Sequence, residues 1–205
     1  SSHMRMRNAV VSDLAIFRPF YKGGIAFLER TENRNTDWRE IYRGNSPLRS
    51  LDIQNSYQAA AFGDVNGDQI DDYALFNIQN RLIRFTWNNE SKGFVQDSIW
   101  KSSCDNCSVA IGSIRGEQHE DSFLIVIGYL DGMLEFYSGY TNPSKIYTTS
   151  YESATPTVAI TQFSNDDRRL HVLVAYSDGA LRYFQYAPDR KSTRLNSSHR
   201  CISYA

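Results

Sequence analysis

Short apolar strands recur along this chain in a fixed order. A strand that follows a tight turn occurs four times, and its aligned positions are spaced by 57, 52 and 47 residues: Ile25, Leu82, Leu134 and Leu181. A compact apolar strand precedes each of these turns, at residues 14–17, 73–76, 123–127 and 172–175. The Asp-Gly pairs at 131–132 and 178–179 are typical of two-residue hairpin turns. The pattern therefore predicts four antiparallel hairpins.

Further strands flank these hairpins. A strand rich in small residues precedes three of them, at 56–62, 108–112 and 156–163, and residues 6–11 are expected to supply the first copy. Alternating strands follow at 38–42, 94–100 and 145–148. Four antiparallel strands repeated about every 40–50 residues are typical of a β-propeller blade. We therefore predict an all-β fold, a β-propeller of about four four-stranded blades, truncated or completed by another copy. A two-sheet sandwich is the alternative.

The repeats also predict the organisation of the chain. The four units lie near residues 6–45, 46–104, 105–152 and 153–189. Residues 1–4 resemble the remnant of a cleaved expression tag. Residues 190–205 are basic and serine-rich without an acidic residue, which is typical of a non-native or flexible tail. No outer strand is predicted for the fourth unit, because this tail begins where that strand belongs.

Composition narrows the classes of protein to consider. The 205 residues include 22% charged residues and carry a formal net charge of −1. This balance excludes a highly charged disordered chain and a nucleic-acid binder that depends on bulk positive charge. The longest apolar run, residues 123–130, has eight residues and is too short to cross a bilayer as a helix. No nucleic-acid partner and no membrane span are expected.

One loop carries a pattern of oxygen-bearing residues. Positions 1, 3, 5 and 9 of a nine-residue segment are Asp64, Asn66, Asp68 and Asp72, and the backbone carbonyl of Ile70 occupies position 7. A hard cation such as Ca²⁺ takes several oxygen ligands, and alternate residues of a turning chain can face one centre. Three carboxylates this close repel one another unless a cation lies between them. The loop therefore predicts a calcium site.

This loop resembles the FG-GAP or VCBS type of propeller repeat found in the integrin α-chain head. Phe62 and Gly63 followed by the DxNxDxxxD pattern carry the resemblance. It implies that Asp64, Asn66, Asp68, the Ile70 carbonyl and Asp72 bind Ca²⁺, and it implies cell-surface recognition or adhesion. The corresponding loops of the third and fourth units lack the full pattern, so one structural ion is expected.

Other candidate chemistry is sparse. Cys104 and Cys107 form a CxxC motif with no second pair for zinc, and either a short disulfide or two reduced thiols fits the spacing. His119 and His171 are read as exposed loop residues outside any catalytic triad. No GxSxG or HExxH motif occurs.

These observations favour a non-enzymatic, calcium-stabilised β-propeller recognition module for protein binding or cell-surface adhesion. A carbohydrate-binding lectin and an intracellular scaffold propeller of a multi-subunit complex are the alternatives. The expected partner is a protein, with a carbohydrate as the alternative, and an open propeller edge would permit self-association. The expected location is extracellular or in the lumen of the secretory pathway, with the cytoplasm as the alternative.

Overall fold

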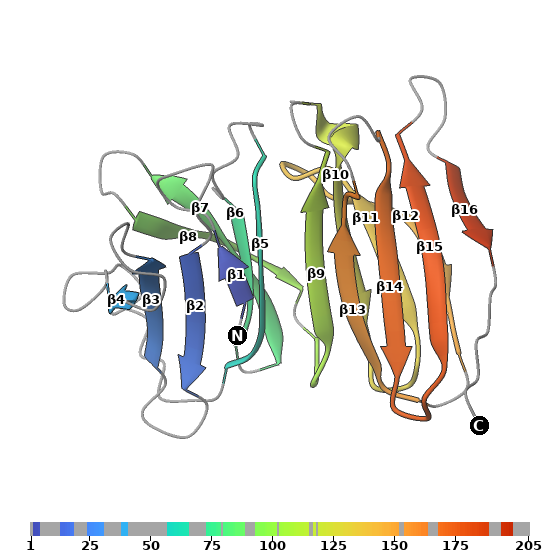
Figure 1. The fold of residues 1–205 in the computed structure, drawn as a ribbon, viewed down its shortest axis with the longest axis horizontal. Helices are drawn as coiled ribbons and strands as arrows, with labels where there is room; N and C mark the ends of the chain where they lie inside the picture. The colour runs from blue at the N-terminus through green and yellow to red at the C-terminus, as the bar shows by residue number, and fades with distance from the viewer. Residues whose placement is uncertain are drawn as a thin grey trace. The chain divides into compact units, whose positions relative to one another are not determined.

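The computed structural model describes residues 2–4, 13–18, 24–30, 38–40, 57–65, 73–78, 80–88, 93–101, 103–114, 117, 119–151, 154–163, 168–188 and 194–198. The chain divides into two compact units, residues 1–104 and 105–205. Each unit contains two antiparallel sheets of four strands, drawn in Figure 1. The described part of the chain is all-β, and its one helical segment is the 3₁₀ turn η2 at Glu120–Ser122. None of its helices could cross a membrane.

Unit 1 contains two sheets whose strands follow chain order. Sheet A is formed by β1 (Ser2–Met4), β2 (Asp13–Arg18), β3 (Gly24–Arg30) and β4 (Trp38–Glu40). Sheet B is formed by β5 (Tyr57–Gly63), β6 (Tyr73–Ile78), β7 (Arg81–Asn88) and β8 (Gly93–Lys101). The strand β1 lies within the segment that resembles a tag remnant, whereas the expected first strand at residues 6–11 lies outside the described residues.

Unit 2 repeats the same order twice. Sheet C is formed by β9 (Ser108–Ser113), β10 (Phe123–Gly128), β11 (Leu134–Ser138) and β12 (Ser144–Thr149). Sheet D is formed by β13 (Pro156–Thr161), β14 (Leu170–Tyr176), β15 (Leu181–Ala187) and β16 (Arg194–Ser198). The fourth sheet therefore has an outer strand, paired with β15, where the sequence predicted none. The four four-stranded sheets match the number of sheets that the sequence predicted.

The hairpin turns have the backbone conformation that the sequence predicted. Gly132 has φ +83° and Gly179 has φ +90°, and Asn80 takes the corresponding left-handed conformation in the β6–β7 turn with φ +59°. Glycine and asparagine tolerate positive φ better than other residues, which is why they occupy these turns. In the two hairpins of unit 2, Asp131 Oδ1 accepts a hydrogen bond from Met133 N at 3.0 Å, and Asp178 Oδ1 accepts one from Ala180 N at 2.9 Å.

Sheets C and D pack face to face around one core. Figure 1 shows sheet D, in orange and red, lying in front of sheet C. The buried core between them draws residues from both sheets and from the segments that follow β9 and β12: Ala110, Ile114, Leu124, Val126, Leu134, Phe136, Ala154, Val158, Leu170, Val172, Val174, Tyr176, Phe184 and Tyr186. All six residues of β10 are buried. A strand buried on both faces carries a continuous apolar sequence rather than an alternating one.

The first strands of the two sheets approach each other closely. A Cβ atom added at Gly112 in β9 would lie 3.2 Å from the Cβ of Ile160 in β13. A Cβ added at Gly128, the last residue of the neighbouring strand β10, would lie 2.6 Å from Pro156 Cγ of β13 and 2.8 Å from Ser108 Oγ. This crowding explains why the strands at this point carry small residues.

Candidate functional site

The predicted calcium loop connects two paired strands of unit 1. Gly63 at the end of β5 is paired with Tyr73 at the start of β6, so the two ends of the nine-residue loop meet. Asp64 is partly exposed directly after β5. Asn66, Asp68, Ile70 and Asp72 lie outside the described residues. Within the part of the chain that is described, no three His, Cys, Asp or Glu side chains form a group that could hold a metal.

The paired strand ends fit the predicted ligand set in one respect. The paired residues Gly63 and Tyr73 are the sequence neighbours of Asp64 and Asp72, the first and last predicted ligands. A cation site built from alternate residues requires this closure, because the first and last ligands must reach the same ion. Calcium at this loop remains a prediction that the register of sheet B supports.

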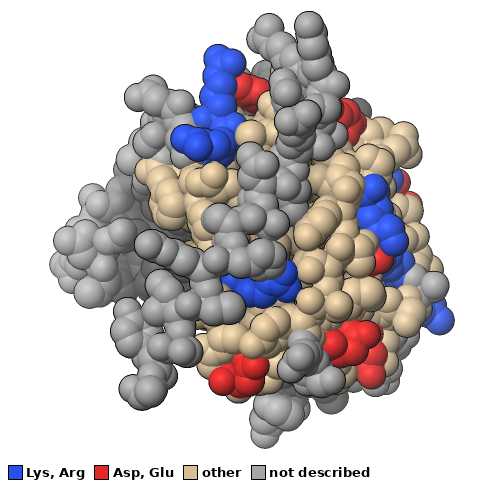
Figure 2. All heavy atoms as spheres, turned by 90° about the vertical axis from the view of Figure 1, so that its right-hand side faces the viewer, with Lys and Arg blue, Asp and Glu red and all other residues tan. Residues whose placement is uncertain are grey.

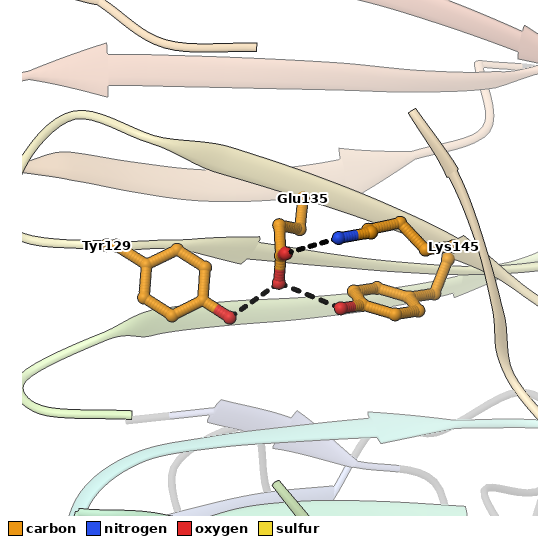
Figure 3. Close-up of polar contacts among 4 residues, drawn as sticks. Tyr129, Glu135 and Lys145 are labelled. Atoms are coloured by element: carbon orange, nitrogen blue, oxygen red, sulfur yellow. Dashed lines mark hydrogen bonds and ion pairs between the residues drawn. The ribbon is translucent and has the colours of Figure 1, made fainter. Parts of the chain in front are cut away.

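A second polar centre lies in sheet C and was not predicted from the sequence. Glu135 of β11 is only 7% exposed. Its Oε2 accepts hydrogen bonds from Tyr129 Oη at 2.6 Å and Tyr137 Oη at 2.8 Å, and Lys145 Nζ lies 3.1 Å from Oε1. Figure 3 shows Glu135 pointing between Tyr129 and Lys145. We call these four residues the Glu135 cluster.

The Glu135 cluster holds a buried negative charge next to two neutral phenols. Burial raises the pKa of Tyr129 above its ordinary value, and so do its hydrogen bond to Glu135 and the negative charge of that carboxylate. The same causes, in the same order, raise the pKa of Tyr137. Both tyrosines therefore stay protonated and act as hydrogen-bond donors to the carboxylate. Hydrogen bonds to an ionised acceptor are stronger than neutral ones.

The Glu135 cluster meets solvent on one side. The Lys145 side chain is 51% exposed, and Tyr129 is partly exposed next to the β10–β11 turn. The carboxylate is therefore buried but lies close to the surface, beneath a lysine and a tyrosine that solutes can reach. One feature of the sequence points to this buried carboxylate: Glu135 is an acidic residue inside an otherwise apolar strand. Buried charged residues are rare unless they are paired.

The equivalent position in sheet D also carries a buried charge. Arg182 lies 47 residues after Glu135 and is 8% exposed. Its guanidinium donates hydrogen bonds to Ser150 O and Thr149 Oγ1, both at 3.3 Å, and stacks 5.0 Å from the centre of the Phe184 ring. Sheets C and D thus place opposite charges at the same strand position.

A third polar group lies at the other end of sheet D, and it corrects a prediction. His171 was read as an exposed loop residue, but it lies in β14 and is 4% exposed. Its Nδ1 hydrogen-bonds to the hydroxyl of Tyr183, which also accepts a bond of 2.8 Å from Gln185 Nε2. The ring of Phe163 packs on the imidazole at 4.2 Å between centroids. His119 is exposed, as predicted.

The structure settles the alternatives for the two cysteines. Cys104 and Cys107 are both disulfide-bonded, and with three cysteines in the chain they bond to each other. Cys104 is also held by its backbone: its amide donates to Asn80 O at 2.7 Å, and its carbonyl accepts from Asn77 Nδ2 at 2.7 Å. The disulfide closes a short loop directly before β9.

Charged side chains are dispersed on the face shown in Figure 2. The described Lys and Arg side chains lie apart from one another there, with Asp and Glu between them and uncharged residues over most of the described surface. This face offers no continuous positive patch among its described residues.

Comparison with known proteins gives a likeness in fold. No protein-family model matches the chain, and no curated protein sequence matches it. Among solved structures, a putative 6-phosphogluconolactonase from Bacteroides uniformis is 11% identical with a TM-score of 0.50, covering 92% of this chain and 54% of that one. The periplasmic gluconolactonase PpgL of Pseudomonas aeruginosa is 13% identical with a TM-score of 0.46, covering 90% of this chain and 52% of that one.

These likenesses change the interpretation of the chain. It spans about half the length of both solved proteins. The likeness to the Bacteroides protein supports a propeller-like all-β fold. The prediction of a non-enzymatic recognition module is contradicted, because the protein that shares this fold carries the name of an enzyme. The adhesion, lectin and scaffold interpretations depended on that prediction and are withdrawn with it.

Proposed function

We propose that this chain forms blades of a β-propeller enzyme that hydrolyses a sugar lactone. The observation that carries the proposal is the shared fold with a protein named for lactone hydrolysis, over 92% of this chain. The order of strands supports the propeller: the chain forms four consecutive four-stranded sheets, and β9 and β13, the first strands of sheets C and D, lie next to each other. First strands of adjacent propeller blades meet near a common axis.

The Glu135 cluster is the group of described side chains best suited to this chemistry. In lactone hydrolysis, water adds to the carbonyl carbon, its proton passes to a base, and the ring C–O bond breaks as the ring oxygen takes up a proton. Glu135 would accept the proton from water and return it to the ring oxygen. The ammonium of Lys145 would stabilise the negative charge on the carbonyl oxygen. Tyr129 and Tyr137 hold the carboxylate in place.

The experiment is a hydrolysis assay with glucono-1,5-lactone, followed by the acid released in a weakly buffered indicator solution. We expect the chain to exceed the spontaneous rate, and we expect Glu135→Gln to lose about 10²-fold or more of that excess. Asp131→Asn is the matched control, because it removes a carboxylate in the exposed β10–β11 turn and keeps the oxygen that accepts from Met133 N. A folded chain with no rate above buffer contradicts the proposed activity.

We also propose that Ca²⁺ binds the β5–β6 loop and stabilises unit 1, as the resemblance to FG-GAP or VCBS repeats implies. The closed register at Gly63 and Tyr73 supports this proposal. Titration calorimetry with Ca²⁺ should show one site, and Asp68→Ala should abolish it. If Asp68→Ala leaves the heat of Ca²⁺ binding unchanged, or if the original chain shows no heat of binding, the calcium site is refuted.

The disulfide supports an oxidising compartment for the mature protein, in line with the expected extracellular or lumenal location. Disulfides persist in such compartments and are rare where glutathione keeps thiols reduced. Labelling of the protein in intact cells tests this: Cys104 and Cys107 should resist a thiol reagent until a reductant is added. Free thiols at both positions would instead favour the cytoplasm.

A further inference from the structure

Arg182 is a buried cation on the face of sheet D that packs against sheet C. It is 8% exposed, and its register partner is Val174, which belongs to the core between the two sheets. Directly paired residues project from the same face of a sheet, so the side chain of Arg182 lies at this interface. A charged side chain is rarely buried unless an opposite charge accompanies it. The partners of Arg182 therefore decide what this residue does.

The described partners of Arg182 are neutral. Its Nη atoms donate to Ser150 O and Thr149 Oγ1, each over 3.3 Å, and the Phe184 ring lies against the guanidinium. Hydrogen bonds from a guanidinium to an anion are shorter, about 2.7–2.9 Å. No Asp or Glu among the described residues forms an ion pair with Arg182. A guanidinium has five N–H donors, so Arg182 retains donors and a positive charge that the described side chains do not match.

The equivalent position in sheet C shows how this fold matches a buried charge. Glu135 is buried to nearly the same degree, with 7% exposure, but it accepts from two phenols and has the ammonium of Lys145 as its counter-charge. One copy of the repeat therefore takes its counter-charge from the chain, whereas the described part of the other copy supplies none. A bound anion would pair Arg182 as Lys145 pairs Glu135.

A second buried group lies beside Arg182. Tyr176 is on the same face of sheet D, two residues beyond Val174, and is 5% exposed. Its hydroxyl forms no hydrogen bond of ordinary geometry with the described residues. Burial raises the pKa of Tyr176, and the guanidinium of Arg182, close to the hydroxyl, opposes that rise. A protonated phenol and a guanidinium with unused donors are groups that bind the oxygen atoms of an anion.

We propose that Arg182 and Tyr176 bind a small oxyanion, either a carboxylate or a phosphate group. The guanidinium donates to one or two oxygens of the anion and the Tyr176 hydroxyl donates to another, so the ligand supplies both the counter-charge and the missing acceptor. The approach from solvent is at the end of β12, where Thr149 is partly exposed and Ser150 is exposed.

This site is distinct from the Glu135 cluster. Glu135 lies between Leu134 and Phe136, which belong to the core between sheets C and D, and successive strand residues point to opposite faces of a sheet. Glu135 therefore projects from the other face of sheet C. The proposed anion site is independent of the proposed hydrolysis.

The test is a titration of the whole isotope-labelled chain with inorganic phosphate and, separately, with acetate, followed by nuclear magnetic resonance. We expect the amide signals of Thr149 and Ser150 and the Nε–H signal of Arg182 to shift and saturate with at least one of these anions. Sodium chloride at the same ionic strength should leave them unchanged. Saturation with phosphate alone assigns a phosphate group to the site, and saturation with acetate alone assigns a carboxylate. No saturation with either anion would overturn the proposal.

Three variants connect the binding to these side chains. Tyr176→Phe keeps the buried ring and removes the hydroxyl, and it should weaken anion binding about tenfold or more, because a hydrogen bond to a charged group is lost. Arg182→Gln should abolish the saturable shifts. Arg168→Gln is the matched control, because it removes a positive charge from a side chain of the same unit that is 76% exposed, and it should bind as the original chain does.

The variants also define the contrary results. Far-UV circular dichroism establishes that each variant is folded, and if Arg182→Gln does not fold, Tyr176→Phe decides. Unchanged affinity in either variant would place the anion elsewhere and overturn the proposal. Glu152 lies outside the described residues. If saturable shifts appear only in Glu152→Gln, the chain supplies the counter-charge itself, and the proposal is wrong.

Discussion

Replacing two equivalent leucines by alanine tests the relation between sheets C and D quantitatively. Leu134 and Leu181 occupy the same strand position, 47 residues apart. Leu134 is 0% exposed in the core between the sheets, whereas Leu181 is 44% exposed and lies outside that core. The residue type, the strand position and the substitution are the same, so any difference in cost comes from what packs against the side chain.

The burial of each leucine sets the expected size of the effect. Truncation of a fully buried leucine costs about 2–5 kcal/mol of unfolding free energy, depending on how far the cavity collapses. Complete burial of a leucine is worth about 1.5–3 kcal/mol, and Leu181 is only partly buried within the chain, so Leu181→Ala should cost about 1 kcal/mol or less.

The assay must report on unit 2. All three tryptophans, Trp38, Trp87 and Trp100, lie in unit 1, so tryptophan fluorescence in urea follows that unit alone. Hydrogen exchange of the β10 and β11 amides measures the opening of sheet C directly. We expect Leu134→Ala to accelerate exchange in β10 strongly and Leu181→Ala to leave it nearly unchanged. Equal effects of the two variants would refute the reasoning, because they would show that both leucines pack alike.

Three further predictions concern single interactions. Tyr137→Phe removes a donor from the buried carboxylate and should cost about 1–3 kcal/mol by thermal or urea unfolding, whereas Lys145→Ala, at an exposed side chain, should cost much less. Because the pKa values of Tyr129 and Tyr137 are raised in the folded chain, the unfolded state releases protons first, and unfolding free energy should fall as pH rises past about 10; a flat or rising alkaline profile would contradict the buried donors. Reduction of the Cys104–Cys107 disulfide should lower unfolding free energy by about 2 kcal/mol, and a thiol count that already includes both cysteines before reduction would disprove the bond.

The repeat was the part of the fold that the sequence pattern predicted well. The tight turns at Asp131–Gly132 and Asp178–Gly179 fix two hairpins by local backbone preference, and both occur with the expected positive φ. The continuous apolar run of β10 predicted a strand buried on both faces, and all six residues are buried. These features depend on residues close together in the chain, which is why pattern reasoning finds them.

The outer strand of sheet D was missed for a physical reason. Strand β16 lies in a basic, serine-rich segment with no apolar alternation, yet its residues 194–198 pair with β15. An edge strand is held by backbone hydrogen bonds to its neighbour, and these place little demand on sequence. The alternation of apolar and polar residues therefore gives almost no indication of this edge strand.

The polar centres were harder to predict than the strands. Glu135 and Arg182 occupy equivalent positions, but their partners come from residues 129–150, and only the folded register brings them together. His171 was read as exposed because it follows a polar loop, whereas the packing of Phe163 and the Tyr183 hydroxyl cover it. When the partners that bury a polar residue are distant in the chain, the sequence around that residue does not predict its burial. The function prediction from the sequence was wrong for a related reason, since it depended on one nine-residue loop rather than on the fold of the whole chain.

An engineered disulfide between β9 and β13 tests most directly the claim that sheets C and D are adjacent copies of one repeat. The Cβ of residue 112 would lie 3.2 Å from that of Ile160, near the separation of about 3.5–4.5 Å usual in disulfides, whereas Leu173 is 46% exposed and lies outside the core between sheets C and D. In a chain with Cys201→Ser, the account predicts that Gly112→Cys with Ile160→Cys oxidises to a bond that mass spectrometry detects as the loss of two hydrogens, and that Gly112→Cys with Leu173→Cys does not. Free thiols in the first pair, or bonding in the second, would contradict the stacked-sheet account.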